Sequence, residues 1–327
     1  MTAPRLVLSL QGGGALGATQ LGAFRAMVEH GLQPDVVAGI SIGAVNAALI
    51  AGNRPTQRLR AMETFWRTIS WPGTGWYRGL VGPMRSWLNL QAVSQAALFG
   101  QPGFFTPNLS MKQRGLYSLA PMRRTLRRLI DWQYLNSSDA PGVSIGAVRR
   151  RDGRLHFFDN QHGALSLDHV EASGALSPGF SGVRLTDDEL YIDGGSVDGS
   201  PIDGALSLED DRPTWVLAVD LCSRWTAPQR ALRDAQPIDV AEHHQMLVEG
   251  LRVRRGGRGA PIWIQPVTVD VSLMRFKTGL SDFSQATIQE RAQDGARAMM
   301  EALCEGAVER NAFFETAGPG AIGLAVG

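Results

Sequence analysis

The sequence predicts an α/β fold of three layers, α/β/α, with a mainly parallel central sheet. Within the first 52 residues a buried strand, a helix, a second short strand and a second helix follow one another. Strands and helices that alternate at this spacing form parallel sheets with helices on their faces. The length of 327 residues is also sufficient for one large core.

Four N-terminal segments carry this prediction. RLVLSLQ (5–11) is a short apolar run that ends in glycines, which is typical of a buried strand. GATQLGAFRAMVEHG (17–31) has apolar residues at helical spacing and ends in a glycine stop signal. DVVAG (35–39) predicts the second strand, and IGAVNAALIAG (42–52) predicts the second helix.

An aromatic-rich insertion is predicted at about 71–115, after an amphipathic helix at 54–70. The segment is rich in Gly, Pro, Asn and Ser and only weakly periodic, as functional insertions often are. We expect it to contain short helices and to interrupt a core that spans 1–220. Its aromatic side chains could form an acyl pocket, an interfacial patch or only a small core of their own. They are Trp71, Trp76, Tyr77, Trp87, Phe104 and Phe105.

The rest of the chain continues the alternation. Helices are predicted at 121–132, 166–176, 239–255 and 284–303, and buried strands at 190–195, 214–221 and 261–267. GVSIGAVRR and RLHFFDN, separated by RDG, predict a hairpin. We expect 221–316 to pack on the same domain and 317–327 to form a flexible tail.

Composition excludes several classes of function. The 32 basic and 31 acidic side chains leave a formal charge of +1, which does not suggest a nucleic-acid partner. The cysteines, Cys222 and Cys304, are too few for a disulfide framework or a cysteine zinc site, and we expect neither metal nor cofactor. No apolar run reaches the roughly 20 residues of a transmembrane helix. We therefore expect a cytoplasmic protein whose membrane contact, if any, is peripheral at the inner membrane surface.

A serine elbow is predicted at Gly39-Ile40-Ser41-Ile42-Gly43, which matches G-x-S-x-G. This pattern places the serine on a sharp turn between a strand and a helix, so that its hydroxyl is exposed at the sheet edge. Both flanking elements are predicted here, and Ser41 is therefore a candidate nucleophile. The alternative is a tight turn whose serine only caps the second helix.

QGGGALG (11–17) lies between the first strand and the first helix. Consecutive glycines at a helix N-terminus can turn several backbone N–H groups toward one anion. One interpretation is an oxyanion hole formed by the amides around Gly12, Gly13 and Gly14 together with the amide of Ile42.

The same loop allows a second interpretation, because Gly12, Gly14 and Gly17 satisfy the dinucleotide-binding pattern G-x-G-x-x-G. That pattern also needs an acidic residue at the end of the second strand, where it holds a ribose hydroxyl. Asp35 is at a suitable spacing but stands at the start of that strand. The sequence therefore favours the oxyanion hole.

Two candidate bases for Ser41 emerge. In the usual triad order the acid and then the histidine follow the serine, and Asp220 with His243 or His244 satisfies this order. Both histidines, however, lie inside a predicted helix, whereas the triad histidine normally stands on a loop after a strand. This position favours a role on the helix surface or in partner binding.

Asp193 is the second candidate. It ends the predicted strand LYIDGG, and Gly194 and Gly195 after it allow another segment to come close. Ligands of parallel sheets bind at the ends of the strands, so Ser41 and Asp193 could meet there. The alternative is that Asp-Gly-Gly is an ordinary turn.

Together, three motifs in order resemble those of the patatin-like phospholipases. They are Gly12-Gly13-Gly14-Ala15-Leu16-Gly17, the Ser41 elbow and Asp193-Gly194-Gly195. EASGALSPGFSGVRL (171–185) resembles the segment before the Asp motif, and DFSQATIQER resembles a C-terminal extension of a bacterial subgroup. The resemblance is strongest over about residues 5–220 and implies a patatin-like core.

The resemblance implies a hydrolase of lipid carboxylic esters that uses a Ser-Asp dyad, of the phospholipase A or lysophospholipase type. Ser41 would be the nucleophile and Asp193 the general base, with the glycine loop as oxyanion hole. Two alternatives stay open: a Ser-His-Asp esterase that uses Asp220 and His243 or His244, and a lipid-binding scaffold without catalysis. Arginines on the predicted helix 121–132 could attract anionic headgroups or form a solvated face. They are Arg123, Arg124, Arg127 and Arg128.

Overall fold

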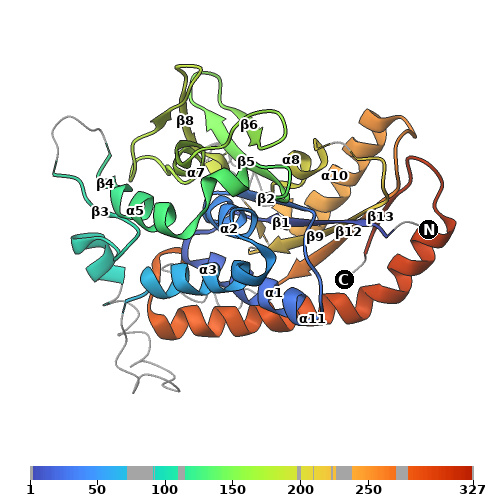
Figure 1. The fold of residues 1–327 in the computed structure, drawn as a ribbon, viewed down its shortest axis with the longest axis horizontal. Helices are drawn as coiled ribbons and strands as arrows, with labels where there is room; N and C mark the ends of the chain where they lie inside the picture. Colours follow the sequence, from blue (N-terminus) through green and yellow to red (C-terminus); the bar gives the residue numbers. More distant parts are fainter. Residues whose placement is uncertain are drawn as a thin grey trace.

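The computed structural model describes residues 3–71, 91, 93–109, 115–196, 200–208, 210–221, 224–225, 238–269 and 279–325. Its centre is a nine-stranded sheet (Figure 1). In spatial order the strands are β13 (Ile322–Leu324), β12 (Ile262–Thr268), β9 (Thr214–Asp220), β1 (Arg5–Leu10), β2 (Val36–Ile40), β5 (Gly142–Arg149), β8 (Leu190–Asp193) and β7 (Val183–Arg184), with β6 (Arg154–Asp159) also paired to β5. Neighbours from β13 to β5 are parallel, whereas β6, β7 and β8 pair antiparallel. The predicted mainly parallel sheet is confirmed.

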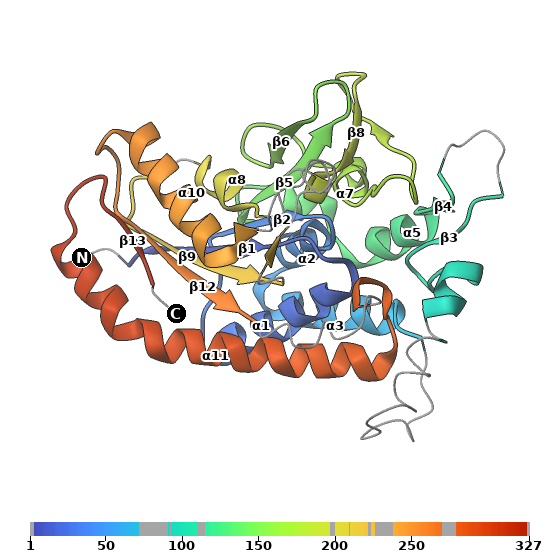
Figure 2. The ribbon, with the colours of Figure 1, turned by 180° about the vertical axis from the view of Figure 1, so that it is seen from behind.

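Helices cover both faces of this sheet (Figures 1 and 2). One face carries α1 (Ala18–Glu29), α2 (Ile42–Ala51), α3 (Pro55–Thr68) and α11 (Gln285–Thr316), and the other carries α8 (Ile202–Leu206) and α10 (Val240–Arg255). In β1, Leu8 points into the core on the α1 side and Val7 into the core on the α10 side. Because both faces are buried, the strand is a continuous apolar run rather than an alternating one.

Shorter elements complete the fold, most of them at the carboxyl-terminal end of the sheet. They are η1 (Gly14–Gly17), α5 (Ala120–Leu129), α6 (Trp132–Leu135), α7 (Leu167–Ser173), η3 (Gly194–Ser196), η5 (Gly279–Ser281), the hairpin of β3 (Thr106–Pro107) with β4 (Tyr117–Ser118), and the hairpin of β10 (Arg224–Trp225) with β11 (Ile238–Asp239). The short helix α6 lies instead at the start of β5, where Asn160 donates to the carbonyl oxygen of Leu135 and accepts the N–H of Val143. Within the expected insertion, residues 93–99 are helical. Trp76, Tyr77 and Trp87 lie outside the described residues.

The C-terminal region differs from the expectation in two ways. Helix α11 runs to Thr316 instead of ending at 303, and β13 forms within the expected flexible tail. Tertiary contacts explain both differences, since the ring of Phe313 packs 5.2 Å from that of Trp263 and Ile322 is buried. Neither contact is visible in the local sequence.

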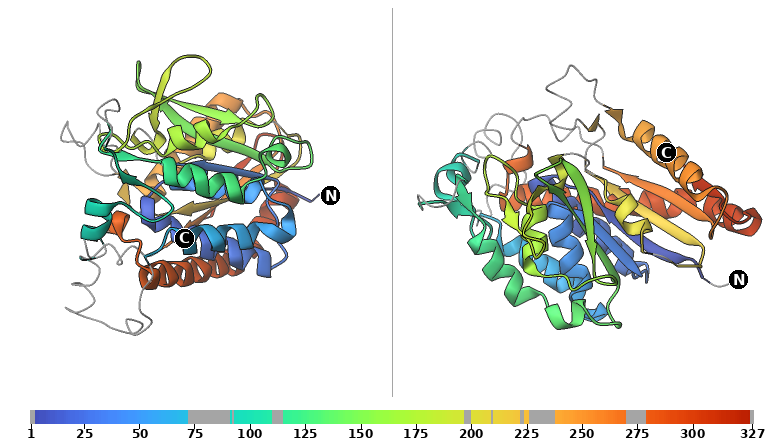
Figure 3. Two further views of the ribbon diagram at one scale, coloured as in Figure 1. Left: turned by 60° about the vertical axis from the view of Figure 1, so that its left-hand side comes forward. Right: turned by 90° about the horizontal axis from the view of Figure 1, so that it is seen from above.

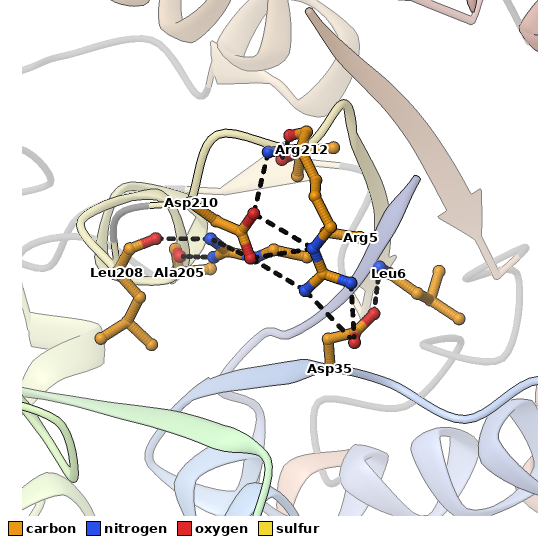
Figure 4. Close-up of polar contacts among 8 residues, drawn as sticks. Arg5, Leu6, Asp35, Ala205, Leu208, Asp210 and Arg212 are labelled. Carbon is orange, nitrogen blue, oxygen red and sulfur yellow. Dashed lines mark hydrogen bonds and ion pairs between the residues drawn. The ribbon is translucent and has the colours of Figure 1, made fainter. Parts of the chain in front are cut away.

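The amino-terminal edge of the sheet is held by a cluster of charges (Figure 4). The buried guanidinium of Arg5 donates to the carbonyl oxygens of Leu208, at 2.6 Å, and Ala205, at 3.1 Å. Asp35 accepts the N–H of Leu6 at 2.8 Å. A cleft of about 1200 Å³ opens at this edge and is lined in part by Asp35 and Leu6. It therefore lies at the opposite end of the strands from Ser41.

Candidate active site

Ser41 stands between β2, which ends at Ile40, and α2, which begins at Ile42. Its backbone has φ 56° and ψ −124°, a conformation that costs a residue other than glycine about 1–3 kcal/mol. The side chain is partly exposed, although every residue of α2 is buried. A strained turn that presents a serine at the end of a parallel strand has the geometry of a nucleophile elbow.

Two glycines make this turn possible. A Cβ on Gly39 would lie 2.2 Å from the carbonyl oxygen of Gly43, and a Cβ on Gly43 would lie 2.0 Å from the carbonyl oxygen of Leu10. Both distances are too short for any side chain, so β1, β2 and α2 approach one another only because these residues are glycines. Gly17 meets the same helix, since a Cβ there would lie 2.7 Å from the side chain of Ile42.

Asp193 ends β8, and the structure brings it to Ser41. The Ser41 hydroxyl donates to Oδ2 of Asp193 at 2.7 Å, although 152 positions separate the residues. The N–H of Gly195 donates to Oδ1 at 2.8 Å. Gly194 runs against Gly146, since a Cβ on it would lie 2.7 Å from the Gly146 carbonyl oxygen. The carboxylate is thus fixed on one oxygen and offers the other to the serine.

Burial sets the basicity of this carboxylate. The side chain of Asp193 is 3% exposed, and burial raises its pKa to about 6, against smaller opposing effects of the hydrogen bonds from Ser41 and Gly195. An unperturbed aspartate has a pKa of about 3.9. Asp193 is therefore still ionised at pH 7 but is a stronger base than an exposed aspartate.

Ser173, at the end of α7, is a residue whose role the sequence did not reveal. Its hydroxyl accepts the backbone N–H of Ser41 at 2.8 Å and donates to the carbonyl oxygen of Gly146 at 2.6 Å. Ser173 is fully buried. It therefore ties the strained backbone of Ser41 to β5. The only signal was its place in the Ala-Ser segment before the Asp motif.

The glycine loop lies beside the serine. A Cβ on Gly12 would lie 3.2 Å from the Cβ of Ser41, and Gly14 has a left-handed φ of 54°. Within the described part of the chain, the N–H groups of Gly12 and Gly13 donate to no acceptor. Ile42 is the first residue of α2, where N–H groups precede the intrahelical hydrogen bonds. The amide of Gly12 is therefore close to Ser41 and has no competing acceptor among the described residues, and the amide of Ile42 follows Ser41 directly.

A buried polar network supports this loop from behind. The side chain of Gln20 donates to the carbonyl oxygen of Gln11 at 2.7 Å. Asn46 donates to Gln20 at 2.7 Å and to the carbonyl oxygen of Gly17 at 3.1 Å, and accepts the indole N–H of Trp66 at 3.1 Å. Gln20 and Asn46 are fully buried amides on mostly apolar helix faces, a signal from which a supporting role could have been inferred. The network links the loop to α1, α2 and α3.

The alternative acid and base lie together at another place. Nε2 of His244 is 3.4 Å from Oδ2 of Asp220, and both side chains are buried. Asp220 is the last residue of β9, and β1 lies between β9 and β2, the strand that leads to Ser41. The side chain of Asp220 faces α10, whereas α2 covers the opposite face of the sheet. Burial raises the pKa of Asp220 to about 8. The side chain of His243 lies outside the described part.

The geometry around Asp35 also bears on the dinucleotide interpretation. Asp35 accepts the N–H of Leu6 and lies 3.4 Å from the guanidinium of Arg212 (Figure 4). It thus stands at the amino-terminal edge of the sheet, whereas Gly12, Gly14 and Gly17 stand at the carboxyl-terminal edge. An acid at the opposite edge cannot hold the ribose of a nucleotide whose phosphates lie on the loop.

Two aromatic residues of the insertion, Phe104 and Phe105, pack against the main hydrophobic core. The ring of Phe104 lies 5.5 Å from that of Phe283 and 6.4 Å from that of Phe65, and the ring of Phe105 lies 5.7 Å from that of Phe180. Phe104 and Phe105 are both partly buried. These two residues therefore pack against the main core of the protein rather than forming a core of the insertion alone. They join the insertion to α3 and to the segment after α7.

Two negative findings hold for the residues that the structure describes. Among these residues, no three or more His, Cys, Asp or Glu side chains are grouped so that they could hold a metal ion. None of the helices there combines the length and the hydropathy that a membrane span requires.

A family model described as patatin-like phospholipase matches residues 8–206, more than half of the chain. The chain belongs to the patatin-like phospholipase family. The match includes the glycine loop, the Ser41 elbow and Asp193. Patatin-like phospholipase domain-containing protein 7 of Mus musculus is 33% identical over 230 residues, which are 68% of this chain and 14% of that protein.

Other similarities are shorter or more distant. Triacylglycerol lipase SDP1L of Arabidopsis thaliana is 39% identical over 66 residues, which are 20% of this patatin-like chain and 8% of that protein. The crystal structure of VipD from Legionella pneumophila is 15% identical with a TM-score of 0.43, covering 92% of this chain and 66% of that one. The chain spans only a small part of the length of the curated relatives that it matches.

Proposed function

We propose that this patatin-like protein is a serine hydrolase of lipid carboxylic esters. Ser41 is the nucleophile, Asp193 the general base, and the amides of Gly12, Gly13, Gly14 and Ile42 form the oxyanion hole. The observation that carries the proposal is the 2.7 Å hydrogen bond from the strained Ser41 to the buried Asp193. Membership of a phospholipase family supports the lipid ester as substrate class.

In the acylation step, the Ser41 oxygen attacks the ester carbonyl carbon while its proton moves to Oδ2 of Asp193. The negative charge that develops on the carbonyl oxygen is stabilised by the loop amides, and each such donor contributes about 3–4 kcal/mol in comparable hydrolases. When the tetrahedral intermediate collapses, the bond to the alcohol breaks and Asp193 returns the proton to the leaving oxygen. The products are the free alcohol and an ester of Ser41.

In the deacylation step, water attacks the ester of Ser41 and Asp193 accepts its proton. Collapse of the second intermediate releases the carboxylic acid, and Asp193 returns the proton to the Ser41 oxygen. Asp193 can act in both directions because its pKa of about 6 lies close to neutral pH. Its hydrogen bond from Gly195 holds the carboxylate in place throughout.

The decisive experiment compares the wild type with Ser41→Ala. We expect Ser41→Ala to abolish hydrolysis across a panel of esters that varies in chain length and headgroup, and to abolish labelling by a fluorophosphonate. Ser144→Ala is the matched control, because Ser144 is a fully buried serine on the neighbouring β5 whose hydroxyl has no hydrogen-bond partner among the described residues. Activity that survives in Ser41→Ala would disprove the proposal.

The same panel tests the two alternatives. A Ser-His-Asp esterase would lose its activity in His244→Ala and retain much of it in Asp193→Asn. A scaffold that only binds lipid would leave Ser41 unlabelled in the folded wild type while lipid binding remained saturable.

A further inference from the structure

Exposed apolar side chains are concentrated at one end of the molecule. Of the ten large hydrophobic residues that are most exposed in the described part, six belong to segments at or beside the carboxyl-terminal end of the sheet (Figure 1). We call them the apolar rim, and they are Leu98, Phe99, Leu109, Leu116, Leu176 and Leu280, with exposed fractions from 49% to 95%. The other four are distributed over α10 and α11. A concentration of this kind usually marks an interaction surface.

Two residues of the apolar rim are joined directly to the proposed active site. The carbonyl oxygen of Leu280 would lie 2.6 Å from a Cβ on Gly14, so η5 rests against the glycine loop. Leu176 follows Ala175, whose carbonyl oxygen accepts the N–H of Asp193 at 3.1 Å. The rim therefore begins at the two loops that hold the base and the oxyanion donors.

The other rim residues lie on segments that contact one another (Figure 3). The hydroxyl of Tyr117 donates to the carbonyl oxygen of Ala97 at 2.7 Å, next to Leu98 and Phe99. The N–H of Tyr117 donates to the carbonyl oxygen of Gly179 at 2.8 Å, which joins Leu116 to the segment that carries Leu176. Residues 93–99, the hairpin of β3 with β4 and the segment after α7 thus adjoin one another.

Positive charge begins beside this surface at Arg124 and continues along α5 through Arg127 and Arg128. The helix ends at Leu129, whose carbonyl oxygen accepts a hydrogen bond from the side chain of Asn53 at the amino-terminal edge of the sheet. Helix α5 packs on the insertion, since the N–H of Met122 donates to the carbonyl oxygen of Phe104 at 3.0 Å. Its residues Arg124, Arg127 and Arg128 are exposed, and none of them pairs with an acid within the described part of the chain. Arg123, by contrast, pairs with Asp168 and Glu171.

We propose that the apolar rim and these three arginines form a docking surface for an anionic lipid bilayer. The leucine and phenylalanine side chains enter the interfacial region, and the guanidinium groups bind phosphate headgroups. The proposal rests on the proposed function, because docking here would bring ester bonds of the bilayer to Ser41. The complementary charge of α5 favours an anionic bilayer over a protein partner.

The binding arm of the test uses Ser41→Ala as background, so that vesicles are not hydrolysed. Vesicles of phosphatidylcholine with about one third phosphatidylglycerol are sedimented with the protein. We expect Leu98→Asp/Phe99→Asp to reduce the vesicle partition coefficient at least tenfold. Val253→Asp/Val308→Asp is the matched control, since these residues are similarly exposed on α10 and α11, and we expect a change of less than twofold.

A third variant tests the arginines. Arg124→Gln/Arg127→Gln/Arg128→Gln should weaken binding to anionic vesicles and leave the weaker binding to pure phosphatidylcholine unchanged.

The activity arm separates this proposal from the proposed function. With Ser41 present, Leu98→Asp/Phe99→Asp should lower hydrolysis of vesicle lipid at least tenfold. Its hydrolysis of a soluble short-chain ester should stay within twofold of wild type, which also shows that the variant folds.

Equal vesicle binding by rim and control variants would overturn the docking surface while leaving the hydrolase intact. A wild type that binds vesicles but cleaves no ester would instead overturn the proposed function. If the rim variants change the oligomeric state in sedimentation and not vesicle binding, a second copy of the chain covers this surface and the proposal is wrong.

Discussion

Two buried aspartates end two strands of the same sheet, and their surroundings differ. Asp193 accepts hydrogen bonds from Ser41 and from the N–H of Gly195, and its pKa is about 6. Asp220 faces His244 at 3.4 Å, and burial raises its pKa to about 8. Burial alone therefore does not make a base for a serine, because the carboxylate must also be ionised at the working pH and reach the hydroxyl.

The largest expected difference between the two aspartates is in activity. Asp193→Asn should lower kcat at least a thousandfold on a soluble ester, because an amide cannot accept the Ser41 proton. Asp220→Asn should change kcat less than threefold. The measurement is steady-state hydrolysis with active-site titration by fluorophosphonate. The reverse order of effects would assign the base to Asp220 and His244.

The pH dependence of catalysis should report Asp193. Because the base must be ionised, kcat/KM should fall about tenfold per pH unit below the pKa of about 6 and level off above about pH 7. Asp220→Asn should retain this profile. A profile governed by an ionisation near pH 8 that disappears in Asp220→Asn would contradict the proposed role of Asp193.

Ser173→Ala should have an intermediate effect. The substitution leaves the N–H of Ser41 without its acceptor, and an unsatisfied buried donor costs about 1–3 kcal/mol. We expect kcat/KM to fall about tenfold to a hundredfold with KM nearly unchanged, since the loss disturbs the nucleophile and not the binding of substrate. Ser144→Ala is the control, because it removes a buried hydroxyl that has no partner in the part of the chain that the structure describes. Equal effects of the two variants would refute the positioning role.

The two Asn variants should also differ in stability, and this is the smallest of the expected effects. The raised pKa values of Asp193 and Asp220 mean that the folded protein binds a proton on each carboxyl group more tightly than the unfolded chain does. The stabilisation that this binding gives the folded protein is complete below about pH 4 and is lost as the pH rises to the folded pKa. An asparagine does not titrate, so each Asn variant avoids this loss. The free energy of unfolding of the variant minus that of the wild type should therefore increase with pH by up to about 1.4 kcal/mol per pH unit. The increase should stop at about pH 6 for Asp193→Asn and at about pH 8 for Asp220→Asn.

Urea unfolding of both variants at pH 5, 6 and 8 checks this prediction. The two variants should behave alike between pH 5 and 6 and diverge between pH 6 and 8. Parallel curves over the whole range would show that the two carboxyl groups do not differ in the folded protein.

Local patterns predicted much of the fold. Short apolar runs placed β1, β2, β9 and β12 within one or two residues, since both faces of such strands are buried. The end of α11 and the strand β13 were missed because Phe313 and Ile322 depend on contacts with β12 that have no local signal. Ser173 was missed as a functional residue for the same reason, because its partner Ser41 lies 132 positions away.

The sequence by itself determined the mainly parallel sheet, the position of the serine turn and the residues between which a base had to be chosen. Apolar periodicity indicates the sheet, and glycine and serine at fixed spacing indicate the turn. Both signals are contained in short stretches of the chain. Only the tertiary structure decided which aspartate the Ser41 hydroxyl contacts and how basic that carboxyl group is. The physical reason is that distance and desolvation depend on the packing of segments remote in sequence, and here that packing buries Asp193 beside Ser41 and Asp220 beside His244.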